Sequence, residues 1–135
     1  MIIHYLCRVL NQLISLIMKL LRRKIDRHLT EWKNRSDHMP LIIKGARQVG
    51  KTASVMEFAR ANYRNVVAIN FVLEQKYKAV FDDGYDVDSV IRNISLINPD
   101  FMFESGNTLV FFDEMQDCPQ CATCLKAFCI DGRYD

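Results

Sequence analysis

The chain has 135 residues, 50% of them hydrophobic and 25% charged, which fits one globular domain and excludes a disordered or collagen-like protein. The net charge is only +2, but residues 1–64 carry 13 Lys and Arg against 4 Asp and Glu, whereas residues 65–135 carry 5 against 12. Such asymmetry fits attraction between the basic and the acidic half of the chain as well as it fits a polyanionic partner. Charge alone therefore does not identify a nucleic-acid-binding protein.

Residues 1–36 are predicted to be helical. Polar residues recur every three or four positions, at His4, Arg8, Asn11/Gln12, Ser15 and Lys19, and apolar residues fill the rest. The longest uncharged apolar run, residues 9–18, is shorter than the ~20 residues of a spanning helix, so a membrane partner is not expected. The main interpretation is a helix packed against the domain or a partner. The basic residues at 22–27 leave two alternatives, a helix lying on a membrane surface or a nucleic-acid contact, and nothing else in the sequence supports the latter.

Strands and helices are predicted to alternate after residue 40. Apolar runs bounded by turn residues predict buried strands at 41–43, 66–71 and 108–112. Helical spacing predicts helices over 52–63, 74–81 and 87–97, and a last helix with Pro119 as its first residue and Cys118 as its cap. This alternation argues for an α/β fold with a parallel sheet.

The segment after the first predicted strand fits the phosphate-binding loop pattern G-x-x-x-x-G-K-[ST]. It reads Gly45-Ala46-Arg47-Gln48-Val49-Gly50-Lys51-Thr52, with a predicted strand before it and a predicted helix after it. The glycines let consecutive backbone N–H groups point at phosphate oxygens, and the N-terminus of the helix favours the same anion. Lys51 is expected to reach the β- and γ-phosphates, and the Thr52 hydroxyl is expected to bind Mg²⁺.

A second motif ends the strand predicted at 108–112, where two adjacent carboxylates, Asp113 and Glu114, follow. A carboxylate at the end of a buried strand can hold Mg²⁺, which is the Walker B role, and we predict it for Asp113. Glu114 can then act as the general base for an attacking water. The plainer interpretation is an exposed acidic turn after a strand.

Together the two motifs resemble those of AAA-type P-loop ATPases, and more narrowly of a bacterial and archaeal group with an uncharacterised C-terminal domain. The resemblance runs from about Leu21 to the end of the chain. It rests on the segments 22–33, 40–52 (ending G-A-R-Q-V-G-K-T), 69–71, 112–116 (F-D-E-M-Q) and 125–129. It implies ATP and Mg²⁺ as cofactors, hydrolysis, and a homo-oligomer in which a neighbour donates an arginine.

The same resemblance implies roles for individual residues. Gly45, Gly50, Lys51 and Thr52 would bind phosphate and metal, and Asp113 would support the metal. Glu114 would activate water, with Lys51 acting on the phosphates. Gln116 is implied as a weaker candidate for sensing the γ-phosphate.

The resemblance also implies a three-layer α/β/α core with strand order 5-1-4-3-2, of which this sequence supplies the first three strands. We therefore expect an N-terminal helical extension (1–36) followed by a truncated AAA-type ATP-binding core (37–135). The strand before the phosphate-binding loop would then lack a neighbour, because strands four and five have no counterpart. This chain alone is therefore not expected to hydrolyse ATP. The alternative is a non-enzymatic interaction fragment that docks through its N-terminal amphipathic helix.

Five cysteines do not form the even, dispersed set of a secreted disulfide framework, so we expect reduced thiols in a cytoplasmic protein. Four of them, Cys118, Cys121, Cys124 and Cys129, are close enough in sequence to raise the alternative of a metal site. On a helix, however, their thiols would point in different directions, whereas Cys121, Cys124 and Phe128 would share one apolar face. We therefore expect them to be structural residues of the core.

Overall fold

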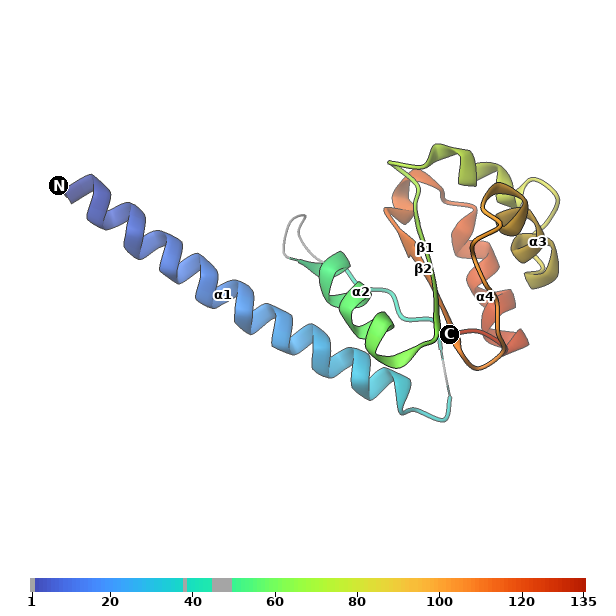
Figure 1. Ribbon diagram of the computed structural model, residues 1–135, viewed down its shortest axis with the longest axis horizontal. Coiled ribbons are helices and arrows are strands. Elements are labelled where there is room, and N and C mark those ends of the chain that lie inside the picture. Colours follow the sequence, from blue (N-terminus) through green and yellow to red (C-terminus); the bar gives the residue numbers. More distant parts are fainter. Residues whose placement is uncertain (1, 38, 45–49) are drawn as a thin grey trace. The chain divides into compact units, whose positions relative to one another are not determined.

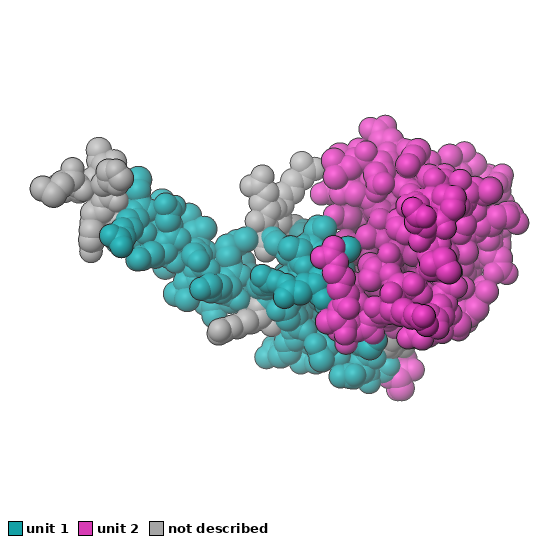
Figure 2. Space-filling model, in the orientation of Figure 1, with its two compact units in different colours: residues 1–35, 42–58 teal, residues 36–41, 59–135 magenta. Residues whose placement is uncertain are grey.

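The computed structural model describes residues 2–37, 39–44 and 50–135 (Figure 1). Its elements are α1 (Ile2–Lys33), α2 (Lys51–Asn62), β1 (Asn65–Asn70), the 3₁₀ helix η1 (Gln75–Phe81), α3 (Val87–Ile97), β2 (Thr108–Asp113), the 3₁₀ helix η2 (Met115–Asp117) and α4 (Cys121–Asp131). The chain forms two compact units, residues 1–35 with 42–58 and residues 36–41 with 59–135 (Figure 2).

The first unit contains the long helix α1, as predicted, and most of α2. Leu29 is the buried residue among the described side chains of α1, and Val55 and Phe58 are buried on α2. Arg22 of α1 forms an ion pair with Glu57 of α2. The apolar side chains between residues 6 and 21 are largely exposed. No helix in the described part of the chain combines the length and apolar character needed to cross a bilayer.

The second unit is built on β1 and β2, which form a parallel two-stranded sheet. The register runs from Asn65 opposite Thr108 to Asn70 opposite Asp113. Parallel pairing of these two strands confirms that they are neighbours, as the implied strand order requires. Two parallel strands that follow each other in the chain must be joined by a crossover connection, and here η1 and α3 form it.

One face of this sheet carries the hydrophobic core. Side chains alternate between the two faces of a strand, so Val67 and Ile69 of β1 share a face, and Phe71 continues it. These residues belong to one buried cluster with η1, α3 and α4. The cluster consists of Val67, Ile69, Phe71, Tyr77, Val80, Phe81, Val87, Val90, Ile94, Cys118, Cys121, Cys124 and Phe128. The helices therefore cover that face of the sheet.

Residues 133–135 run along the outer edge of β2 and were not predicted as part of the sheet. The Asp135 N–H donates to the Thr108 carbonyl over 3.2 Å, and the Val110 N–H donates to the Asp135 carbonyl over 2.8 Å, which is a parallel bridge. The Tyr63 hydroxyl donates to Asp135 Oδ2 over 2.7 Å. Burial, together with this bond, raises the pKa of Tyr63 above its ordinary value. In the implied strand order, this edge is where strand four pairs.

Three predicted elements differ from the structure. Residues 41–43 are not a strand, because a strand needs a neighbour and the two strands in the described part of the chain pair with each other. Residues 75–81 form a 3₁₀ helix rather than an α-helix. Helix α4 begins at Cys121 after a turn at Pro119 and Gln120, so Pro119 is not its first residue and Cys118 is not its cap.

Candidate functional site

The predicted phosphate-binding loop is described only at its end, since Gly45, Ala46, Arg47, Gln48 and Val49 lie outside the described residues. The described part begins with Gly50, whose φ is +80°. Only glycine adopts this backbone region at little cost. A Cβ built on Gly50 would meet Met18 Cε at 4.0 Å, an ordinary contact, so the requirement for glycine is conformational and not steric.

Helix α2 begins immediately after Gly50, as predicted. The Ser54 N–H donates to the Gly50 carbonyl over 3.0 Å, and Lys51 and Thr52 occupy the first turn. Lys51 is half-buried and Thr52 is exposed. The first turn of α2 contains no acidic residue, and the N-terminus of a helix carries a partial positive charge. This arrangement fits the binding of an anion such as a phosphate group.

The carboxylate pair lies at the carboxyl end of β2. Asp113 is the last residue of the strand and is half-buried. Its two oxygens each receive a hydrogen bond, Oδ1 from the Glu114 N–H over 3.0 Å and Oδ2 from the Asn70 amide over 3.4 Å. The carboxylate is thus held by its own strand and by the neighbouring strand β1. Carboxylate oxygens held in this way are ligands that Mg²⁺ prefers.

Glu114 has an unusual backbone conformation, with φ 56° and ψ 44°. Among the described residues it is the one non-glycine residue with positive φ. The left-handed region is costly for a residue with a Cβ, and such residues cluster at functional sites. The Gln116 amide donates to Glu114 Oε2, so the two side chains predicted to act on water and on the γ-phosphate contact each other.

Asn70 is the residue of this site that sequence reasoning did not assign. Its side-chain oxygen accepts from the N–H groups of Val72 and Leu73, each over 3.0 Å, while its amide reaches Asp113. The sequence did contain a signal for Asn70, because this polar residue ends an otherwise apolar strand. Such residues gather at the carboxyl edge of a parallel sheet, where ligands bind in α/β proteins.

The predicted site residues therefore form two groups. Asp113, Glu114 and Gln116 lie together in the second unit, and Lys51 and Thr52 lie together in the first. The first group contains the carboxylates of Asp113 and Glu114, and the second lies in the first turn of α2.

A comparison with protein-family models decides the family. Residues 37–135 match the model of an AAA domain. The chain belongs to this family. Membership makes residues 37–135 a nucleotide-binding module of the ATPase type, in agreement with the resemblance seen in the sequence. No curated protein and no solved structure gave a significant match.

Three of the four clustered cysteines are part of the core, as expected, whereas Cys129 is half-buried and lies outside the buried cluster. Cys118, Cys121 and Cys124 are completely buried, and none of the five cysteines forms a disulfide. Burial raises the pKa of both Cys121 and Cys124 to about 12, so these thiols stay protonated at neutral pH. No group of three potential metal-binding side chains occurs among the described residues. The metal alternative therefore has no support in the part of the cluster that the structure shows.

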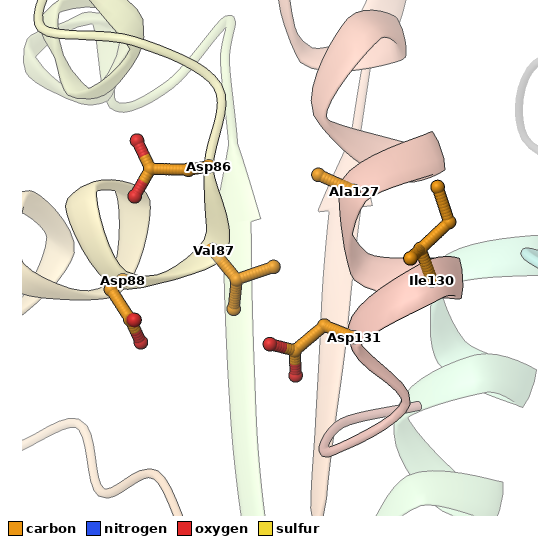
Figure 3. Close-up of a pocket in the computed structure, with 6 residues that line it drawn as sticks. All are labelled: Asp86, Val87, Asp88, Ala127, Ile130 and Asp131. Carbon is orange, nitrogen blue, oxygen red and sulfur yellow. The ribbon is translucent and has the colours of Figure 1, made fainter.

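The AAA domain also has an open pocket of about 370 Å³ between the start of α3 and the end of α4 (Figure 3). Asp86, Asp88 and Asp131 line it, but none of the predicted site residues does. Arg133 bonds to Asp131 Oδ1 over 2.7 Å and to Asp88 Oδ1 over 2.6 Å. Hydrogen bonds from Arg133 lower the pKa of Asp131. Since Asp86 caps α3, the acidic groups here have structural partners.

Proposed function

We propose that residues 37–135 bind ATP with Mg²⁺ through the loop from Gly45 to Thr52 and through Asp113, at a site equipped for hydrolysis. The observation that carries the proposal is the geometry at the end of β2. There Asp113 is oriented by Asn70 of the neighbouring strand, and Glu114 is held in a left-handed conformation beside it. Family membership supports the nucleotide, and Gly50 followed by the N-terminus of α2 supports the phosphate contact.

In this proposal each residue has one task. Backbone N–H groups of the loop and the Lys51 ammonium bind the phosphates. Thr52 and Asp113 provide oxygen ligands for Mg²⁺, which when bound neutralises developing charge on the phosphates. Glu114 accepts the proton of the attacking water at a carboxylate oxygen, and Gln116 holds that carboxylate in position.

Nucleotide binding is tested by titrating the purified chain with a fluorescent ATP analogue and Mg²⁺. We expect saturable binding that Lys51→Ala weakens at least ten-fold. Lys44→Ala is the matched control, because it removes the same charge from an exposed position just before the loop. Equal binding by the wild type and Lys51→Ala would overturn the proposal.

Hydrolysis is tested separately. Glu114→Gln keeps the size of the side chain but removes its basic oxygen, so we expect nucleotide binding to be kept while release of phosphate is lost. Because the family resemblance implies an arginine from a neighbouring subunit, turnover is expected to be slow for isolated copies. Glu104→Gln, which changes a partly exposed carboxylate before β2, controls for the loss of one negative charge.

A second candidate function is an interaction module. The exposed apolar residues of α1 favour it, among them Leu10 and Leu13, with 56% and 52% of their surface accessible. This role is compatible with nucleotide binding, since it uses a different segment of the chain.

A further inference from the structure

The apolar residues in the first part of α1 repeat with the period of a coiled coil. Leu6, Leu10, Leu13, Ile17 and Leu20, here called the α1 seam, are separated by steps of four, three, four and three residues. These five side chains are 46–59% exposed. Such spacing keeps one line of side chains on the same side of a helix over its whole length. A line of this kind is buried when a second helix packs along it.

Further apolar residues widen the seam on both sides. Val9 and Leu16 lie along one flank and Ile14 and Leu21 along the other, each between 37% and 56% exposed. The remaining side of this part of α1 carries the polar and charged residues Arg8, Asn11, Gln12, Ser15 and Lys19. The helix is thus amphipathic over residues 6–21, with its apolar side open to solvent.

Among the described residues, the contacts between α1 and the rest of its unit include positions outside this seam. They include Met18, which approaches Gly50, Arg22, which pairs with Glu57, and the buried Leu29. At 100° per residue, these three positions lie about 120–160° around the helix from the seam. The residues that hold α1 to α2 and the residues that could hold a partner are therefore on nearly opposite sides.

We propose that the α1 seam pairs with the α1 seam of a second copy of this chain, in antiparallel orientation. In this register Leu10 lies level with Leu13 of the second copy, and Leu6 lies level with Ile17. The pattern is self-complementary because each of these two pairs of side chains occurs twice, once on either side of the two-fold axis that relates the copies. A seam that matches itself in this way needs no other protein as its partner.

Charge decides the orientation. Lys24 and Arg27 fall on the next two positions of the heptad repeat, so the seam ends in a cluster of cations. A parallel pair would place the two clusters side by side. In the antiparallel pair they lie about 38 Å apart along the axis, at 1.5 Å per residue, well beyond the Debye length of about 10 Å.

The size of the seam predicts a weak dimer. Nine apolar side chains of α1 between residues 6 and 21 are about half exposed. Their burial would remove roughly 300–500 Å² of apolar surface from each copy, which is less than the roughly 800 Å² per partner of a standard interface and falls in the range of weak, transient ones. The dimer should therefore dissociate on dilution.

The test is sedimentation velocity of the whole chain over a range of micromolar concentrations. We expect a concentration-dependent dimer that is lost in the double variant Leu10→Glu, Leu13→Glu. The control Asn11→Glu, Ser15→Glu adds the same charges to the same turns but on the polar side, and it should dimerise as the wild type does. Circular dichroism checks that both variants keep their helix content. A wild type that stays monomeric, or a dimer that survives in the seam variant, would overturn the proposal.

Two further measurements test the antiparallel orientation of the paired helices and the alternative that the seam binds a lipid surface. With Cys7 and Cys129 changed to serine, a Leu6→Cys chain mixed with a tagged Ile17→Cys chain should form a mixed disulfide dimer. Cross-linking of Leu6→Cys chains to each other alone would show a parallel pair and contradict the proposed orientation. Flotation with phosphatidylserine vesicles tests the other partner class. Vesicle binding by a monomeric chain, lost in the seam variant, would assign the seam to a lipid surface and overturn the proposal.

Discussion

Asn70 and Asp113 end two neighbouring parallel strands in register, and the Asn70 amide donates to Asp113 Oδ2 over 3.4 Å. The other side-chain atom of Asn70, its oxygen, accepts from the backbone of Val72 and Leu73. One side chain therefore both turns the chain after β1 and orients the carboxylate that is proposed to bind Mg²⁺. A shift of the strand register by one residue would separate the pair.

Replacing Asn70 should weaken metal-dependent nucleotide binding. In Asn70→Ala the Asp113 carboxylate loses its cross-strand donor, and residues that orient metal ligands typically contribute about ten-fold or more to affinity. We expect the Mg²⁺ concentration needed for half-maximal binding of the ATP analogue to rise by about that factor. Asn65→Ala, at the other end of β1, removes the bond to Glu104 and should leave the Mg²⁺ requirement unchanged. An equal effect of both variants would mean that Asn70 acts only through stability.

The left-handed backbone at Glu114 should be visible in stability measurements. Glycine relieves the cost of positive φ, so Glu114→Gly should be about 0.5–1 kcal/mol more stable than Glu114→Ala in urea unfolding. At Gln116, within η2, the order should reverse, because glycine destabilises a residue with negative φ in a helical turn. If alanine were the more stable substitution at both positions, Glu114 would not be strained.

The buried thiols predict a loss of stability at alkaline pH. The pKa of Cys121 and of Cys124 is about 12 in the folded chain, against an ordinary value of 9.0. The unfolded chain therefore releases these protons first, and the free energy of unfolding falls as the pH rises above 9. Between pH 8 and 10 the loss should be roughly 1 kcal/mol for each thiol.

This dependence is measured by urea unfolding under reducing conditions at several pH values. The double variant Cys121→Ala, Cys124→Ala should be less stable at neutral pH because of lost packing, but its stability should depend less on pH. Cys7→Ala changes an exposed thiol and should keep the wild-type dependence. An unchanged pH dependence in the double variant would contradict the assignment.

Arg133 is expected to stabilise the contact between α3 and the end of α4 modestly. Its bonds to Asp88 and Asp131 are partly exposed, so Arg133→Ala should lower the free energy of unfolding only slightly, and less at high salt. The difference should also shrink as the pH falls and Asp131 takes up a proton, because Arg133 lowers the pKa of that carboxyl. Urea unfolding at two salt concentrations measures it, and Arg92→Ala, on the exposed side of α3, serves as control. A larger, salt-independent loss would point to disrupted packing instead.

Local sequence signals predicted most of the elements. The bounds predicted for the helix at 87–97 agree with α3, because Asp86 caps its first turn and apolar residues follow with helical spacing. The strand at 108–112 agrees with β2 to within one residue. The run at 41–43 has an equally good strand pattern, but a pattern cannot supply the neighbouring strand on which pairing depends.

The candidate site could be predicted in its residue types but not in its supporting contacts. Lys51, Thr52, Asp113 and Glu114 follow from motifs in which the chemistry is local. The role of Asn70 depends on the register of two strands separated by a long crossover, which no local pattern specifies. The left-handed conformation of Glu114 was likewise invisible, since its neighbours carry no glycine or turn signal.

The pairing of residues 133–135 with β2 bears on how this chain behaves at high concentration. An uncovered strand edge with apolar residues such as Leu109 and Val110 is a template for pairing between molecules, and this is a common start of aggregation. The bridge through Asp135 occupies part of that edge, and the Tyr63 hydroxyl fastens it. A tag or fusion attached directly after Asp135 would strain the hydrogen bonds that Asp135 forms with β2 and Tyr63. Solubility and resistance to aggregation on storage should therefore be better with tags placed elsewhere.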